Sequence, residues 1–126
     1  MKHKKDIIII GGGPIGIACA LECKKRNWDY LVLEKGALTN SLFNYPKNMT
    51  FFSTSEKLEI DDIPFISNNP KPNRDEALEY YRRVTTSNNL NINLYETVLS
   101  IEKKSNHFIT KTNKATYQSN QVIICT

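Results

Sequence analysis

The pattern of apolar and polar positions predicts a strand, a helix and a second strand at the start of the chain. Residues 7–10 are four consecutive isoleucines, a β-branched run typical of a parallel strand that is buried on both faces. A helical stretch of about four turns follows a glycine-rich turn. Residues 30–33, Tyr-Leu-Val-Leu, then predict a second buried strand. This order is typical of an α/β protein with a parallel sheet.

The pattern weakens over residues 35–72, which contain four of the five prolines. Such long connections are usually functional in compact domains. Aromatic and hydroxyl side chains are concentrated at residues 40–46 and 50–55. We expect them to form either a hydrophobic cluster beneath the loop or a wall beside a flat cofactor ring.

A second helix is predicted from residue 74 to about residue 87. Asn73 is a suitable N-cap, and Glu76 occupies the capping-box position three residues later. An apolar face at helical spacing is formed by Ala77, Leu78, Tyr81 and Val84. Residues 87–89, Ser-Asn-Asn, end the helix.

The last third of the chain reads as strands. We predict a third parallel strand at residues 90–94 and a β-meander at 97–104, 107–112 and 115–118. A fourth buried parallel strand is predicted at residues 121–126. A simple nicotinamide-binding Rossmann domain uses a helical crossover where this chain has the meander. The sequence therefore favours a flavoprotein domain with parallel strands in the order 3-2-1-4.

The turn after the first strand carries the dinucleotide-binding spacing G-x-G-x-x-G. Gly11 permits the tight turn, Gly13 lets backbone amides approach a pyrophosphate, and Gly16 allows close packing of the helix on the sheet. The helix N-terminus provides unpaired N–H groups for phosphate. Glu34, at the end of the second strand, can accept hydrogen bonds from ribose hydroxyls. We expect the nucleotide at the carboxyl ends of strands 1 and 4.

Composition limits the choice of partners. The chain has 126 residues, one domain by length, with 40% apolar and 24% charged residues. Its net charge is +4, but the 17 basic residues are interleaved with 13 acidic ones. We therefore predict no nucleic-acid partner. No apolar stretch is long enough to span a bilayer and no secretory signal is recognisable, so we predict no membrane association.

The cysteine and histidine pattern predicts neither a disulfide framework nor a metal site. The three cysteines, Cys19, Cys23 and Cys125, include no C-x-x-C pair. We interpret them as free thiols of a cytoplasmic protein. The two histidines and three cysteines have no metal-ligand spacing.

Several segments give the chain a recognisable resemblance over almost its full length. These are Ile-Ile-Ile-Gly-Gly-Gly-Pro at 8–14, Leu-Glu-Lys-Gly at 33–36, Asn-Tyr-Pro at 44–46, Thr-Phe-Phe-Ser at 50–53 and Ser-Glu-Lys-Leu-Glu-Ile at 55–60. The chain resembles the N-terminal FAD-binding part of thioredoxin-reductase-like flavoproteins. It is most similar to the YpdA group, described as bacillithiol disulfide reductases.

The resemblance implies a role for each segment in binding FAD. The glycine loop would hold the pyrophosphate, Glu34 the adenosine ribose, and the backbone of Val98 the adenine. Asn44 and Thr126, the latter in the family's A-T-G turn, would lie toward the flavin. The expected cofactor-binding residues are Gly11, Gly12, Gly13, Pro14, Ile15, Gly16, Glu34, Lys35, Asn44, Val98 and Thr126.

The resemblance also implies an NADPH-dependent flavin oxidoreductase that reduces a low-molecular-weight disulfide or a similar acceptor. In that family NADPH binds a further domain that these 126 residues do not contain, so we expect the chain alone to be an incomplete, catalytically inactive FAD-binding domain. A homodimer is expected for the full-length form. Members that reduce bacillithiol disulfide have a cysteine where this chain has Ile15.

Two alternatives follow from the same residues. One is the corresponding part of another flavoenzyme, such as a ferredoxin–NADP reductase or a monooxygenase. The other is a non-catalytic nucleotide-binding remnant. We also expect an exposed apolar sheet edge beside the fourth parallel strand.

Overall fold

The computed structural model of the chain describes residues 3–126. Four helices and six strands are assigned in this range. The strands are β1 (His3–Ile10), β2 (Tyr30–Leu33), β3 (Ile92–Asn93), β4 (Val98–Lys103), β5 (Phe108–Thr112) and β6 (Thr116–Ile124). The helices are α1 (Pro14–Lys25), α2 (Asn40–Phe43), α3 (Ser55–Leu58) and α4 (Arg74–Ser87). None of these helices is long and apolar enough to cross a bilayer.

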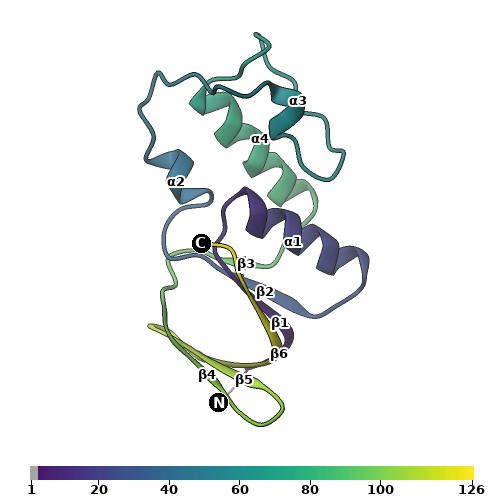
Figure 1. Ribbon diagram of the computed structural model, residues 1–126, viewed down its shortest axis with the longest axis vertical. Coiled ribbons are helices and arrows are strands. Elements are labelled where there is room, and N and C mark those ends of the chain that lie inside the picture. The colour runs from purple at the N-terminus through teal and green to yellow at the C-terminus, as the bar shows by residue number, and fades with distance from the viewer. Residues whose placement is uncertain (1–2) are drawn as a thin grey trace.

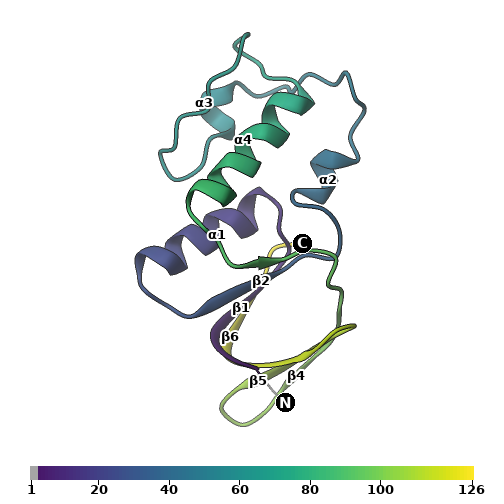
Figure 2. The same ribbon diagram turned by 180° about the vertical axis from the view of Figure 1, so that it is seen from behind.

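The strands form a single sheet in the order β3-β2-β1-β6-β5-β4. Parallel pairing joins β3, β2, β1 and β6, and antiparallel pairing joins β6, β5 and β4. The predicted α/β fold and the parallel order 3-2-1-4 are thus confirmed, with β6 as the fourth parallel strand. Figures 1 and 2 show the four helices on one side of the parallel strands and the β4–β5 hairpin on the other.

The four isoleucines of β1 alternate between two hydrophobic clusters. Ile7 and Ile9 pack with Ala20 and Cys23 of α1, whereas Ile8 and Ile10 pack with a cluster that includes Tyr117 of β6. All four are at most 9% exposed. The prediction of a strand buried on both faces is therefore correct, and it explains why the run does not alternate with polar residues.

Two predicted strands are one strand in the structure. The third arm of the meander, predicted at residues 115–118, and the last parallel strand, predicted at residues 121–126, merge into the single strand β6 from Thr116 to Ile124. The first half of β6 pairs with β5 and β1 together, and the second half continues along β1. The polar residues 119 and 120, left between two predicted strands, are instead part of a long strand that leaves the hairpin and enters the parallel sheet.

Element boundaries also differ from the sequence prediction elsewhere: β1 begins at His3 instead of Ile7, and α1 and β3 are shorter than expected. Helix α1 has 12 residues, slightly fewer than the expected four turns, and it ends before Asn27, which has a positive φ of 57°. Strand β3 has only two residues, Ile92 and Asn93, instead of the five predicted. It lies at the edge of the sheet and pairs with β2 alone.

The long connection before α4 is held against that helix by tyrosine side chains. The hydroxyl of Tyr80 donates to the carbonyl of Ile63 at 2.6 Å, and that of Tyr81 donates to the carbonyl of Leu58 at 2.8 Å. Phe51 packs against the same cluster, while Phe52 is 93% exposed. Phe51 thus fits the expected hydrophobic cluster beneath the loop, whereas Phe52 does not belong to it.

The second half of β6 has an open edge. Strand β5 pairs with β6 only as far as Ser119, so among residues 3–126 the segment 121–124 pairs on one side alone. Ile124 in this segment is 65% exposed. The predicted exposed apolar edge beside the fourth parallel strand is therefore present.

The predicted capping box of α4 is formed. The side chain of Asn73 accepts from the N–H of Glu76 at 2.9 Å, and the Glu76 carboxylate accepts from the N–H of Asn73 at 3.1 Å. We expect Asn73→Ala to lower the free energy of unfolding by about 1 kcal/mol, because the N–H of Glu76 loses the side-chain oxygen that accepts from it. Urea denaturation measures this change.

The matched control for the cap is Asn73→Asp. It keeps an acceptor oxygen at the same position, so its unfolding midpoint should stay close to that of the wild type. Equal destabilisation by alanine and aspartate would contradict a role for the cap.

Candidate functional site

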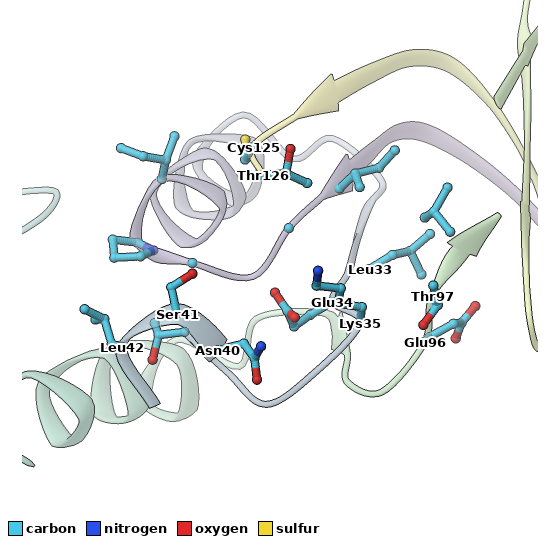
Figure 3. Close-up of a pocket in the computed structure, with 17 residues that line it drawn as sticks. Leu33, Glu34, Lys35, Asn40, Ser41, Leu42, Glu96, Thr97, Cys125 and Thr126 are labelled. Atoms are coloured by element: carbon cyan, nitrogen blue, oxygen red, sulfur yellow. The ribbon is translucent and has the colours of Figure 1, made fainter. Parts of the chain in front are cut away.

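A pocket of about 360 Å³ lies at the carboxyl ends of β1, β2 and β6. Its floor includes Ile10, Leu33 and Cys125, which are at or just beyond the ends of these strands. Figure 3 shows the pocket with the glycine turn and α1 on one side and the β4 entry on the other. In open α/β sheets, ligands bind at this edge, where the strand order reverses. The pocket thus lies where the sequence analysis expects a nucleotide.

Two glycines of the turn are required by the backbone itself. Gly11 has a φ of 110°, and a Cβ there would lie 2.6 Å from the carbonyl oxygen of Cys125. A Cβ on Gly16 would overlap the carbonyl oxygen of Gly11. These glycines let α1 and the end of β6 pack directly against the turn. Replacing either by a residue with a side chain would therefore distort the pocket even without a ligand.

Gly13 differs from them, because a Cβ added to it would meet no protein atom within 4 Å. Gly13 is the N-cap of α1, and Pro14 is in the first turn. No acidic side chain lies in that first turn. The partial positive charge of the helix and its free N–H groups are therefore available to an anion. The open space at Gly13 fits a phosphate group that approaches the backbone closely.

Glu34 braces the loop from the end of β2. Its carboxylate accepts from the N–H of Gly12 at 2.8 Å and from the N–H of Gly36 at 2.7 Å, and the residue is 6% exposed. Each oxygen retains one lone pair for a further donor such as a ribose hydroxyl. Figure 3 shows Glu34 between Ser41 on one side and Glu96 and Thr97 on the other.

The structure brings most of the predicted site residues together. Those that line the pocket are Gly11, Gly13, Pro14, Ile15, Glu34, Lys35, Val98 and Thr126. Gly12 and Gly16 do not line it, but they act behind it, through the Glu34 contact and the close helix packing. Asn44 lies outside the lining, and its side-chain amide donates to the carbonyl of Asn40 at 2.9 Å.

The sequence analysis missed two parts of the wall. One is the segment from Thr39 to Leu42, and the other is formed by Glu96 and Thr97 just before β4. The polar pair Asn40-Ser41 was read only as part of an aromatic and hydroxyl cluster. Glu96 gave no signal, because a lone acid between two strands is usually exposed.

Thr39 joins the first missed segment to the glycine loop. Its N–H donates to the carbonyl of Gly12 at 2.9 Å, and its φ of 48° lies in the left-handed region. A β-branched residue rarely adopts this conformation, and it persists only where the surroundings enforce it. Thr39 is 2% exposed. The fixed conformation of Thr39 therefore directs the following residues, Asn40 and Ser41, to the pocket.

Two free cysteines meet at the floor of the pocket. The Sγ atoms of Cys19 on α1 and Cys125 after β6 lie 3.9 Å apart, whereas Cys23 is buried in the core. Burial and the neighbouring Cys19 raise the pKa of Cys125 to about 11. The prediction of free thiols is confirmed, and two of the three are close enough to be joined by oxidation.

We expect the thiol oxidant diamide to form a Cys19–Cys125 disulfide, with loss of the two thiol hydrogens to the oxidant. The rate should rise with pH, because the thiolate is the reacting form. Peptide mapping by mass spectrometry measures the product. Cys23→Ser is the matched control and should leave the product unchanged, whereas Cys19→Ser should abolish it. A main product that contains Cys23 would contradict the observed arrangement.

The fold and the pocket together define a Rossmann-like domain of the FAD-binding flavoprotein type. Residues 8–126 match the family model described as pyridine nucleotide-disulphide oxidoreductase. The chain therefore belongs to the pyridine nucleotide-disulphide oxidoreductase family.

Among curated proteins, the chain is 48% identical over 124 residues to bacilliredoxin reductase Bdr of Bacillus subtilis, with coverage of 98% of this chain and 38% of the relative. Among solved structures, bacillithiol disulfide reductase Bdr (YpdA) from Staphylococcus aureus has a TM-score of 0.95 and 44% identity, with coverage of 98% of this chain and 38% of that one. The resemblance to the YpdA group is thus confirmed.

A flavin monooxygenase from Stenotrophomonas maltophilia has a TM-score of 0.91 at 18% identity over 97% of this chain and 38% of that chain, which is a likeness of fold alone. This chain spans 38% of the length of each of the three proteins compared.

Proposed function

We propose that this chain binds FAD, with the pyrophosphate at the N-terminus of α1. The observation that carries the proposal is the open space at Gly13, next to a helix N-terminus without acidic residues. At this position phosphate oxygens can reach backbone N–H groups without a side chain in the way. Kinship with flavoproteins of the Bdr type supports FAD as the particular dinucleotide.

The residues around the pocket fit the remaining parts of the cofactor. Glu34, which is held by the N–H groups of Gly12 and Gly36, would accept from the ribose hydroxyls. A 2′-phosphate at that place would meet like-charge repulsion, so the site favours FAD over NADPH. Val98 and Thr126 both line the pocket and would contact the adenine and the flavin side respectively.

We further propose that the domain serves an NADPH-dependent flavin oxidoreductase. The names of the two closely similar relatives, bacilliredoxin reductase and bacillithiol disulfide reductase, support reduction of a disulfide. Bound FAD supplies the hydride acceptance and electron transfer, and this chain's residues bind and orient it. NADPH would bind outside these 126 residues, in a full-length form that we expect to be a cytoplasmic homodimer.

Ile15 favours a second candidate for the electron acceptor. It lines the pocket and is 65% exposed, at the position where disulfide-reducing members carry a cysteine. Isoleucine cannot form a mixed disulfide. An acceptor reduced directly by the flavin, as in a ferredoxin–NADP reductase or a monooxygenase, needs no thiol in the loop.

The direct test is to titrate the purified chain with FAD and follow flavin fluorescence and absorbance near 450 nm. We expect saturable binding by one FAD per chain, with competition by ADP. No NADPH oxidation is expected when NADPH and a disulfide are added. A chain that is folded by circular dichroism and binds neither FAD nor ADP would overturn the proposal.

A negative charge introduced at the N-terminus of α1 should have opposite effects on FAD affinity and on the stability of the fold. We expect Ile15→Asp to weaken FAD binding by roughly 10- to 100-fold, because a carboxylate would repel the diphosphate across a few ångströms. The same acid should stabilise α1 slightly through the helix dipole. Isothermal titration calorimetry and urea denaturation measure the two effects.

The matched control is Ile15→Asn, which has nearly the same shape as aspartate without its charge. The difference between the aspartate and asparagine variants should shrink at high salt, since exposed charges are screened. Equal FAD affinities for the two variants would place the diphosphate elsewhere.

A further inference from the structure

Glu96 is a buried carboxylate without an ion-pair partner among residues 3–126. It is 3% exposed and follows β3 by three residues. Burial of a charge is costly unless hydrogen bonds compensate for it. Glu96 also lies at the wall of the pocket, so the groups that hold its carboxylate bear on the shape of that wall.

Three side chains from three strands compensate for the charge. One oxygen of Glu96 accepts from the hydroxyls of Thr112 and Tyr117, each at 2.7 Å, and the other accepts from the amide of Asn93 at 3.2 Å. Burial raises the pKa of Glu96, but the hydrogen bonds from Tyr117, Thr112 and Asn93 outweigh it and hold the pKa below its ordinary value. Burial and the nearby carboxylate raise the pKa of Tyr117 to about 12, so its hydroxyl remains a donor.

The backbone around Glu96 is tied to the other side of the pocket. The N–H of Glu96 donates to the carbonyl of Glu34 at 2.9 Å, and that of Tyr95 donates to the carbonyl of Gly36 at 3.2 Å. Tyr95 has a φ of 55°, in the left-handed region that non-glycine residues rarely adopt. The turn before Val98 is thus strained and is held by contacts on both flanks.

This turn forms the pocket wall on the side of Glu34 away from Ser41, as Figure 3 shows. If Glu34 faces a ribose and the helix N-terminus faces the diphosphate, the base attached to that ribose meets Thr97 and Val98. Any movement of this wall would therefore change contacts to the nucleoside without changing those to the phosphates.

We propose that Glu96 is a positioning residue for the nucleoside of the cofactor: through Tyr117, Thr112 and Asn93 it fixes the turn that carries Thr97 and Val98. The proposal rests on the FAD-binding function proposed above. Glu96 itself does not need to touch the ligand, because all the contacts seen for its carboxylate are to protein donors.

The test compares Glu96→Gln and Tyr117→Phe with the wild type, using ADP and inorganic pyrophosphate as separate probes in calorimetric titrations. We expect each variant to bind ADP about 10-fold more weakly and pyrophosphate unchanged. The double variant should bind ADP no more weakly than the single variant with the lower ADP affinity, because both substitutions break the same hydrogen-bond network. Ser119→Ala, a buried hydroxyl on the same strand whose partner is the carbonyl of Gln121, is the matched control.

The possible outcomes of these titrations separate the positioning role of Glu96 from the proposed FAD binding. Unchanged ADP affinity in both variants, or equal losses for ADP and pyrophosphate, would overturn the positioning role while leaving FAD binding intact. Additive losses in the double variant would also overturn it. If Glu96→Gln does not fold by circular dichroism, Tyr117→Phe alone carries the test. A folded wild-type chain that binds neither ADP nor FAD would instead overturn the proposed function, and the role of Glu96 with it.

Discussion

Replacement of Gly16 by alanine is expected to lower the free energy of unfolding by at least ~3 kcal/mol, at the upper end of the cost of overpacking. The new methyl group would overlap the carbonyl oxygen of Gly11, which belongs to the backbone and cannot rotate away. Gly11 is itself confined, since its Cα faces the carbonyl of Cys125. Relief would require α1 to move off the sheet, which would expose Ile17 and Ala20.

The measurement for Gly16→Ala is urea denaturation followed by circular dichroism. A loss of this size lowers the melting temperature by roughly 10 °C in a domain of this length. Gly13→Ala serves as the matched control, because its methyl group meets no protein atom within 4 Å. Equal stability of the Gly16→Ala variant and the wild type would show that α1 does not pack on the turn as described.

Gly13→Ala should instead have its large effect on binding. Its methyl group would enter the space proposed for the pyrophosphate, and we expect FAD affinity to fall about 100-fold, or roughly 2.7 kcal/mol. The backbone at Gly13 has a φ of −81°, which alanine adopts without strain. The stability cost should be about 1 kcal/mol or less, since only the N-cap preference changes.

Gly13→Ser strengthens this test. Serine is a better N-cap than glycine, so helix α1 should be at least as stable as in the wild type. Its Cβ nevertheless occupies the same space as that of alanine. If the serine variant unfolds at the wild-type midpoint and binds FAD poorly, the loss of affinity is due to a clash with FAD and not to unfolding. Wild-type affinity in both variants would exclude the pyrophosphate from this position.

Local patterns identified the elements that depend on neighbouring residues. The four isoleucines of β1, the turn from Gly11 to Gly16 and the capping box of Asn73 and Glu76 were all predicted correctly. In each case the physical cause lies within a few residues: burial on both faces of a strand, a backbone that must pass close to another, and unpaired N–H groups at a helix end.

Strand continuity was not predictable in the same way. The sequence analysis ended one strand at Gln118 and began another at Gln121, with the polar residues Ser119 and Asn120 between them, whereas β6 runs through all four positions. At this place the strand crosses from the hairpin to the parallel sheet, and Ser119 is 1% exposed with its hydroxyl bonded to the carbonyl of Gln121. The buried Ser119 hydroxyl therefore has a hydrogen-bond partner, but only once the chain has folded.

The sequence by itself determined the class of domain, the glycine turn and the place of Glu34 at the end of β2, because spacing along the chain sets these features. Only the tertiary structure decided the rest of the pocket. It brings Glu96 to Tyr117 and Cys19 to Cys125, and it holds Thr39 in a left-handed conformation against Gly12. The reason is that these contacts join residues far apart in the chain. Their closeness depends on sheet order and helix packing, which no local pattern of residues encodes.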